Sequence, residues 1–258
     1  MLKNWYIKFN RYILGKQFLP IMSGYLKNYL WTTKRSYEYI LGTYEDPKTQ
    51  QRLISWCKKD AVFYDIGANV GYHAFIANLF ITDGRVYSFE PIPANISLFN
   101  QHLALNKEEM PDHNISLLTF AISDKEKEVQ FSNNETATDG NTYITSSQVY
   151  KQADKILTVQ CFSIDSLLEK AYEPPTILKI DVEGAELDVL KGAVNTLTTY
   201  KPNILLATHD CHLPGIKEKC VSFLTNLGYV LEHTGDHNKQ IAGLDDFIAV
   251  HRDNLSSL

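Results

Sequence analysis

Residues 62–73 read Val-Phe-Tyr-Asp-Ile-Gly-Ala-Asn-Val-Gly-Tyr-His. The apolar start predicts a buried strand, and the glycines predict a tight turn into a helix. Such a turn can bring bare backbone close to a ligand, because glycine tolerates positive φ and has no Cβ. Asp65 stands where a dinucleotide-binding turn would carry its first glycine, and a carboxylate repels a pyrophosphate but attracts a sulfonium or an ammonium. The segment therefore favours S-adenosylmethionine (SAM), held by Asp65, Gly67, Ala68, Asn69 and Gly71.

A second acid, Glu90, ends the next predicted strand, one strand-helix-strand unit after Asp65. That spacing brings both acids to one crevice at the carboxyl edge of a sheet. A carboxylate there can accept both hydrogen bonds from a ribose diol, so we predict that Glu90, with Pro91 and Asn95 beside it, contacts the cofactor. The alternative for Glu90 is that it only caps the following helix.

The third predicted strand ends at Ala121-Ile122-Ser123, which is followed by Asp124. We predict that these residues border an adenine. Ile122 would pack on the ring face, and the backbone or Ser123 would contact the exocyclic amine. The alternative is a simple turn built around the Ser-Asp pair.

Residues 177–186 read Ile-Leu-Lys-Ile-Asp-Val-Glu-Gly-Ala-Glu. An apolar strand here delivers Asp181 and then Glu183 to the cofactor edge, and both are predicted to lie beside the cofactor. Grouping them with Lys179 should perturb their pKa values, as is common at functional sites. The alternative, acids favoured by a helix N-terminus, explains Glu183 and Glu186 but not Lys179 or Asp181.

The fifth predicted strand closes on His209-Asp-Cys-His212. His209 is predicted to act as a general base, because imidazole titrates near neutral pH. A hydrogen-bonded structural histidine is the main alternative. Neighbouring residues on an extended chain point to opposite sides, so the four consecutive groups do not suggest a metal site, and none is assigned. Divalent-metal dependence through Asp181, Glu183 and His209 is kept as an alternative.

From residue 50 onward, strand and helix patterns alternate, which indicates an α/β fold with a parallel sheet. The region 129–162 breaks the alternation and is predicted to be an inserted β-hairpin. Strands are predicted at 61–66, 85–90, 115–122, 176–181, 203–209, 229–233 and 246–251, and helices at 72–80, 95–106, 185–199 and 216–227.

The first 37 residues hold seven basic residues, no acidic ones and many aromatics. They predict two short helices split near Gly15 and Pro20. We expect a basic aromatic helical arm over residues 1–43 and a SAM-binding domain over 44–258. The arm would pack on the main domain, contact a membrane surface or a partner, or form a substrate lid.

The whole chain has 258 residues and a net charge of −5, which gives no reason to expect a nucleic-acid partner. Four widely spaced cysteines fit a reduced compartment. No apolar run approaches the roughly 20 residues of a membrane span, and Lys8 and Arg11 interrupt any signal-peptide core. We therefore expect a cytoplasmic protein, with its oligomeric state open.

Three segments of the chain, 65–71, 89–93 and 178–186, resemble the motifs of the FkbM family of SAM-dependent methyltransferases. Tyr44-Glu45 and the segment 164–167 are also similar, and the resemblance covers roughly residues 40–252. It implies a Rossmann-like class I methyltransferase fold, with a mostly parallel seven-stranded sheet whose last strand is antiparallel. It also implies SAM as cofactor, Glu45 beside it, and methyl transfer to an oxygen of a sugar, a glycan or lipid precursor, or a hydroxylated metabolite.

The mechanism we predict is in-line transfer of a methyl group to a hydroxyl, with rate gained mainly from positioning. His209 or Asp181 would remove the hydroxyl proton, and Lys179 would orient the carboxylates or stabilise the alkoxide. Tyr72 and His73 would face the acceptor, whose identity depends on the arm and the polar loop 133–148. The alternatives are a nicotinamide-dependent oxidoreductase or epimerase, and a non-catalytic docking module with this fold.

Overall fold

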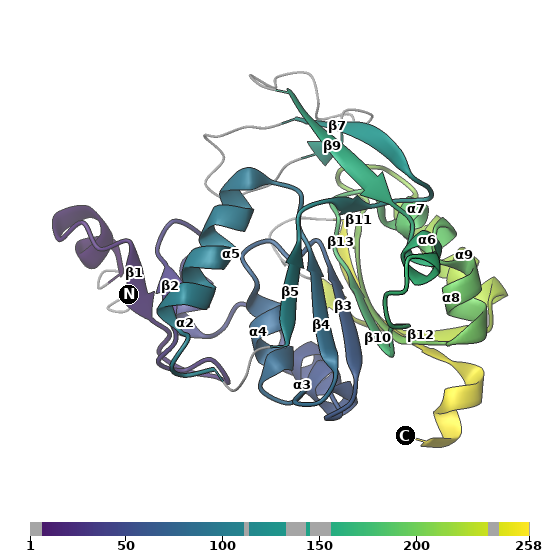
Figure 1. Cartoon of the computed structure of the whole chain (residues 1–258), viewed down its shortest axis with the longest axis horizontal. Coiled ribbons are helices and arrows are strands. Elements are labelled where there is room, and N and C mark those ends of the chain that lie inside the picture. The colour runs from purple at the N-terminus through teal and green to yellow at the C-terminus, as the bar shows by residue number, and fades with distance from the viewer. Residues whose placement is uncertain (1–6, 111–113, 133–142, 145–155, 237–242, 258) are drawn as a thin grey trace.

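The computed structural model describes residues 7–110, 114–132, 143–144, 156–236 and 243–257. A seven-stranded sheet forms its centre, with helices on both faces (Figure 1). Its strands are β3 (Val62–Ile66), β4 (Arg85–Phe89), β5 (Ile115–Leu118), β10 (Ile177–Ile180), β11 (Asn203–His209), β12 (Tyr229–Asp236) and β13 (Leu244–His251).

The strand order is β12-β13-β11-β10-β3-β4-β5. Every pair from β5 to β11 is parallel, and β13 runs antiparallel to both of its neighbours. The predicted class I sheet with an antiparallel last strand is therefore confirmed. The carboxyl ends of its parallel strands meet at the upper edge in Figure 1.

Two hydrophobic cores lie on opposite faces of this sheet, because successive strand residues point to opposite sides. Phe63 packs in the core beneath one group of helices, and Tyr64, the next residue, packs in the other. The first group is α3 (Pro47–Trp56), α4 (Tyr72–Asn78) and α5 (Pro93–Leu105). The second is α6 (Ile164–Glu169), α7 (Glu186–Lys191), α8 (Val194–Thr199) and α9 (Ile216–Asn226), and a short 3-10 helix, η3 (Arg252–Ser257), ends the chain.

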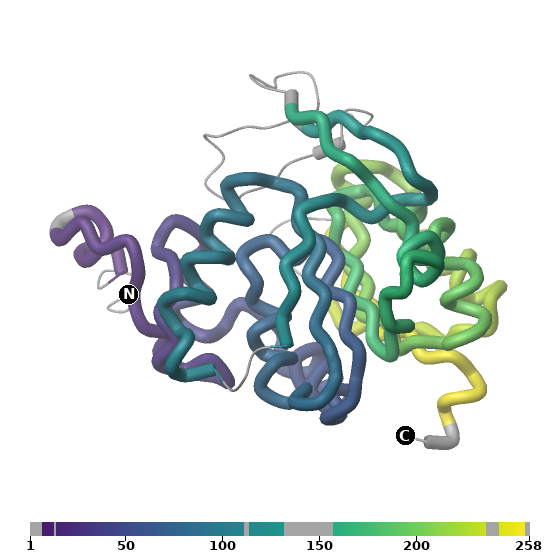
Figure 2. The backbone as a smooth tube through the Cα atoms, viewed as in Figure 1, coloured from purple at the N-terminus to yellow at the C-terminus, as the bar shows by residue number. Residues whose placement is uncertain are grey.

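The N-terminal segment differs from the two helices predicted for it. It forms a π-helical turn, η1 (Phe9–Ile13), two antiparallel strands, β1 (Phe18–Pro20) and β2 (Leu30–Thr32), and the short helix α2 (Tyr37–Leu41). Trp31 is fully buried and stacks on the ring of His102 in α5, with ring centroids 3.9 Å apart. Leu26 and Tyr29 join the same core. The backbone of this segment accordingly lies against α5 (Figure 2).

The predicted inserted hairpin is part of a larger unit, a four-stranded sheet in the order β6-β9-β7-β8. Its strands are β6 (Ala121–Ile122), β7 (Lys127–Ser132), β8 (Tyr143–Ile144) and β9 (Ile156–Phe162), and it lies beyond the carboxyl ends of the main strands (Figure 1). The single strand predicted for residues 115–122 was wrong, because the chain leaves the main sheet after Leu118 and enters the small sheet at Ala121. Apart from 143–144, the polar loop at 133–148 lies outside the described residues.

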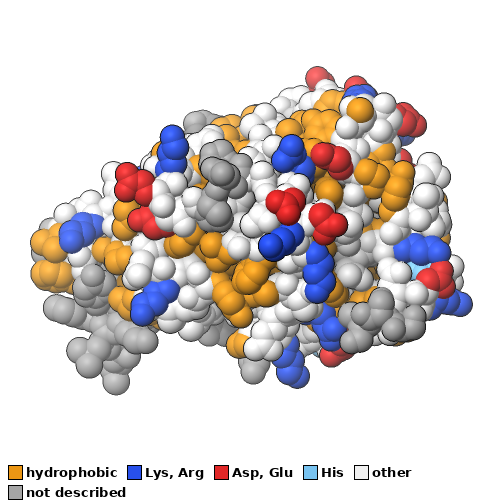
Figure 3. All heavy atoms as spheres, turned by 60° about the horizontal axis from the view of Figure 1, so that its bottom comes forward, with side chains coloured by type: hydrophobic (Ala, Val, Ile, Leu, Met, Phe, Trp, Pro, Cys, Tyr) orange, Lys and Arg blue, Asp and Glu red, His pale blue; other side chains and the backbone are white. Residues whose placement is uncertain are grey.

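Among the described residues, no helix combines the length and the apolar character that crossing a bilayer requires. All four cysteines are free thiols. On the face drawn in Figure 3, acidic and basic side chains are interspersed with hydrophobic and uncharged ones.

Candidate functional site

The glycine turn connects β3 to α4 and takes left-handed backbone conformations, with φ of +78° at Gly67, +51° at Asn69 and +94° at Gly71. A Cβ at Gly67 would lie 1.9 Å from the backbone oxygen of Asp181, at the end of β10. A Cβ at Gly71 would lie 2.8 Å from the ring of Phe99. The missing side chains therefore let the turn pack tightly against its neighbours at the edge of the sheet.

Glu90 fastens this turn to the end of β4. Its Oε2 accepts the backbone N–H of Asn69 at 2.8 Å, and its Oε1 accepts that of Ile92 at 2.9 Å. Burial raises the pKa of Glu90 to about 7, although these hydrogen bonds oppose the shift. Glu90 therefore bonds the backbone on both sides of it, at the glycine turn and at the residue that precedes α5. A carboxylate has about four acceptor sites, so these two backbone bonds leave it capacity for a ligand.

Lys179 links the two central strands. Its Nζ lies 3.3 Å from Asp65 Oδ1 and 3.4 Å from Asp181 Oδ2, and it donates a hydrogen bond to the carbonyl of Gly67. Burial by itself would lower the pKa of Lys179, but the charges of Asp65 and Asp181 outweigh it and raise that pKa. Asp65 has no exposed side-chain surface. The direct contact with a cationic ligand predicted for Asp65 is therefore corrected: the residue is a buried counterion of Lys179.

His209, at the end of β11, lies among three carboxylates. Its Nδ1 is 2.6 Å from Glu186 Oε1, and its Nε2 is 3.4 Å from both Asp181 Oδ1 and Glu183 Oε2. Burial would lower the pKa of His209, but these acids outweigh it and raise that pKa to about 10. An imidazolium cannot accept a proton, so His209 does not fit the predicted role of general base in this arrangement. Asp181, whose side chain is 21% exposed, remains as the candidate.

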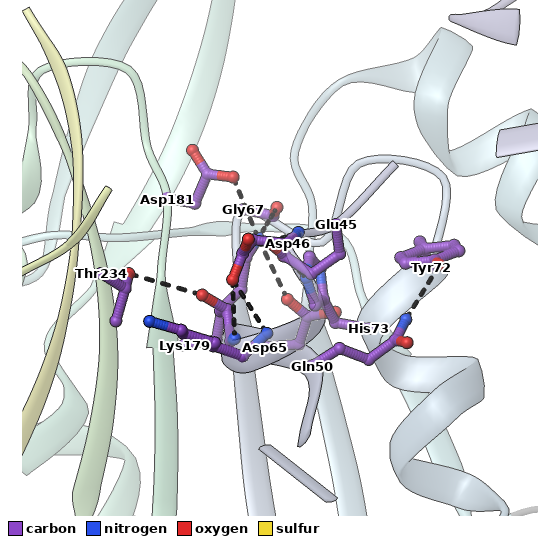
Figure 4. Close-up of polar contacts among 12 residues, drawn as sticks. Glu45, Asp46, Gln50, Asp65, Gly67, Tyr72, His73, Lys179, Asp181 and Thr234 are labelled. Atoms are coloured by element: carbon purple, nitrogen blue, oxygen red, sulfur yellow. Dashed lines mark hydrogen bonds and ion pairs between the residues drawn. The ribbon is translucent and has the colours of Figure 1, made fainter. Parts of the chain in front are cut away.

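A small, partly open hollow lies beside these groups, on the side of the sheet that carries α3 and α4. Glu45 and His73 form an ion pair at its wall, with Nε2 and Oε2 2.7 Å apart (Figure 4). Tyr72, also predicted to face the acceptor, is buried and accepts a hydrogen bond from Gln50 instead. The residues that line the hollow include Glu45, Thr49, His73, Lys179, Asp181 and Phe247.

A comparison with family models identifies the FkbM methyltransferase domain, matched over residues 65–251. The chain belongs to the FkbM methyltransferase domain family. The matched range begins at the end of β3 and contains the glycine turn, Glu90 and the acids around His209.

Relatives of this FkbM domain include two curated proteins. The chain is 31% identical over 146 residues to the hexuronic acid methyltransferase AglP of Haloferax volcanii, an alignment that covers 56% of this chain and 55% of that protein. It is 34% identical over 74 residues to a putative methyltransferase of Jannaschia sp. (strain CCS1), covering 29% and 25%. The chain therefore aligns with about half, or less, of each relative's length.

Among solved structures, the FkbM methyltransferase of Methylobacillus flagellatus KT is similar, with a TM-score of 0.54 and 16% identity. The match covers 75% of this chain and 44% of that one. At this identity the likeness shows the fold alone.

The FkbM domain places the predicted adenine-contacting residues at the junction of its two sheets. Ala121, Ile122 and Ser123 are all buried, and the backbone N–H of Ser123 donates to the carbonyl of Phe162. That amide is therefore already bonded within the protein, and an adenine contact through it is not available without rearrangement.

Arg35 is a neighbour of the site that sequence reasoning missed. Its guanidinium donates to the side-chain oxygen of Asn95, which is buried near Glu90. In a segment rich in basic residues, an arginine suggests a solvent-facing charge, and only the packing of β2 against α5 reveals its position. Pro91, partly buried, lies between Glu90 and α5.

Proposed function

We propose that the chain is a SAM-dependent methyltransferase that methylates a hydroxyl of a sugar, within a glycan or lipid precursor. One observation carries this proposal. The Glu90-fastened glycine turn and the carboxylates around Lys179 share one edge of a class I sheet, with a hollow beside them. Membership of the FkbM family supports methyl transfer as the reaction.

The residues at this edge fit SAM as the methyl donor. The remaining acceptor capacity of Glu90 suits the hydroxyls of a ribose. Asn69 Oδ1 is shielded from solvent and has no hydrogen-bond partner among the described residues, so it suits a ligand donor. Glu45 and Asp181 line the hollow and attract positive charge, as an ammonium and a sulfonium require. When bound, SAM supplies a methyl group on a positively charged sulfur.

Asp181 is the residue we assign to accept the proton of the sugar hydroxyl. Lys179 contacts its carboxylate through Oδ2, and Oδ1 is the oxygen that faces His209. Asp181 would accept the proton that the hydroxyl loses when its oxygen takes the methyl group from bound SAM, which would leave as SAH. Most of the rate enhancement then comes from alignment of the two reactants at this edge.

The sugar acceptor is supported by the relative from Haloferax volcanii, which is named as a hexuronic acid methyltransferase. The varied acceptors implied by the FkbM resemblance are compatible with it. We expect the described edge of the sheet to act on the hydroxyl, whatever part of the glycan the rest of the chain recognises.

Calorimetry and a transfer assay test this proposal together. The protein should bind SAM and its product S-adenosylhomocysteine (SAH) but not NADH, and it should transfer labelled methyl groups to members of a sugar panel that includes hexuronic acids. Asp181→Asn should lower turnover about a hundredfold even when saturating SAM overcomes any loss of SAH and SAM affinity. Asp83→Asn, at an exposed position between α4 and β4, is the matched control and should change neither. Tight NADH binding without SAH binding would overturn the assignment.

A further inference from the structure

His209, Asp181 and Glu183 form a cluster that combines one imidazole with two carboxylates. One nitrogen and two carboxylate oxygens, one atom from each residue, all lie within 4.8 Å of one another. Asp181 directly follows β10, Glu183 lies in the turn after it, and His209 ends the adjacent parallel strand β11. Imidazole and carboxylate are ligands that first-row divalent metals accept together.

The distances match a metal centre better than a hydrogen-bonded one. Nε2 of His209 lies 3.4 Å from both Asp181 Oδ1 and Glu183 Oε2. Hydrogen bonds between charged nitrogen and oxygen are usually about 2.7–2.9 Å long. By contrast, a cation about 2.1 Å from each ligand atom sets neighbouring ligand atoms about 3.0–3.4 Å apart.

Two further observations concern the surroundings of these atoms. The side chain of His209 is only 6% exposed, and its Nε2 lies 3.4 Å from each of two carboxylate oxygens, which is longer than a usual charged hydrogen bond. Glu183 Oε2 is shielded from solvent and lies 3.0 Å from Nδ1 of His212, but it accepts no well-aligned hydrogen bond from the described residues. Burying polar atoms in this state is unfavourable unless something else binds them.

Glu186 orients His209 in the way that carboxylates commonly orient metal-binding histidines. Its Oε1 lies 2.6 Å from Nδ1 of His209, and its side chain has no exposed surface. A carboxylate on one ring nitrogen fixes the tautomer and turns the other nitrogen towards the metal. Lys179 similarly orients Asp181, because it contacts Oδ2 while Oδ1 is the oxygen nearest His209.

We propose that Asp181 Oδ1, Glu183 Oε2 and His209 Nε2 bind one divalent cation of the Mn²⁺ or Zn²⁺ type, with Glu186 as a positioning residue. The proposal rests on the proposed function for its purpose: the cation would hold the acceptor hydroxyl and lower its pKa, so that the hydroxyl loses its proton more readily. Three protein ligands leave positions open for the acceptor and water.

The test is a titration of the metal-free, full-length protein with MnCl₂, followed by calorimetry and by electron paramagnetic resonance, and repeated with ZnCl₂. We expect one ion per chain. Glu183→Gln should abolish binding, because it removes one ligand charge, and Glu186→Gln should weaken it 10–100-fold. Glu218→Gln, at an exposed site in α9, is the matched control and should bind like the unaltered protein.

SAH binding is measured on the same samples, which separates this proposal from the proposed function. If neither metal binds while SAH does, His209 neutralises the carboxylates as an imidazolium alone and the metal proposal is overturned. Metal binding that survives unchanged in Glu183→Gln overturns it as well. Binding of the metal without SAH would instead leave the cation site standing and contradict the methyltransferase assignment.

Discussion

At the residue scale, the carboxylates of this site are held by specific partners rather than left to face solvent. Asp65, which stands where a dinucleotide-binding turn carries its first glycine, is buried against Lys179. Its effect on a ligand is therefore indirect, through the placement of Lys179 and Asp181. The sequence predicted that these three residues would meet, because strand ends converge, but not which would remain accessible. Accessibility depends on side-chain direction, which the motif does not encode.

Gly67 gives a sharp test of the packing between the turn and β10. Gly67→Ala would place a Cβ 1.9 Å from the carbonyl of Asp181 and would also strain a φ of +78°. We expect a loss of about 2–4 kcal/mol in the free energy of unfolding, measured by urea denaturation.

Gly215→Ala is the matched control, because Gly215 has a φ of +80° and a Cβ added there would meet no atom within 4 Å. It should lose only the backbone strain, about 1 kcal/mol. Equal losses in the two variants would show that the close approach to Asp181 is not the cause.

Glu90 makes cofactor binding depend on pH. Its raised pKa of about 7 means that the unliganded protein holds this proton below pH 7, whereas ribose hydroxyls bind the ionised carboxylate. Binding must then release a proton, so SAH affinity should fall up to about tenfold per pH unit as the pH drops below 7.

Calorimetry of SAH binding between pH 5.5 and 8, in buffers of different ionisation enthalpy, measures both the affinity and the released proton. Glu90→Gln should bind SAH more weakly and with a flatter pH dependence. An unaltered protein whose affinity does not change across this range would remove Glu90 from the ribose.

At the scale of elements, the strands that end in functional residues were predictable from the sequence. The breaks that divide a predicted helix or strand in two were not. β3, β4, β10 and β11 were each predicted to within two residues at both ends, because apolar runs stop where polar site residues begin. The helix predicted over 185–199 is instead two helices, α7 and α8. A Cβ at Gly192, between them, would lie 2.1 Å from the carbonyl of Ser123, a tertiary contact that local pattern cannot reveal.

The N-terminal strands provide a prediction at this scale. Trp31→Ala would empty a fully buried position that stacks on His102, so we expect a loss of about 3–5 kcal/mol in the free energy of unfolding. Tyr12→Ala, at a side chain that is 69% exposed, should change it by no more than about 0.5 kcal/mol.

Thermal or urea denaturation of both variants decides whether this segment belongs to the core. A small loss for Trp31→Ala, similar to that for Tyr12→Ala, would mean that residues 7–43 are a detachable arm. The aromatic and basic residues of this segment left open whether the arm packs on the main domain, because sequence alone does not distinguish a buried tryptophan from a surface one.

At the scale of the molecule, the class I sheet gathers groups from distant parts of the chain at one edge. Glu45 precedes the sheet, Glu90 follows β4, Asp181 follows β10 and His209 ends β11. The hollow is lined by Glu45, by Asp181 and by residues of β11. The sequence predicted that Glu90 and Asp181 end strands at one edge of the sheet. The pairing of Glu45 with His73 and of Glu186 with His209 was not, because it depends on how helices pack across the sheet edge.

A crystal structure of the protein with SAH bound gives the sharpest test of the methyltransferase assignment. We expect ribose hydroxyls within hydrogen-bond distance of Glu90, and the amino-acid end of SAH in the hollow beside Glu45 and Asp181. SAH seated away from the glycine turn, or the same edge occupied by a nicotinamide nucleotide in preference to SAH, would contradict it.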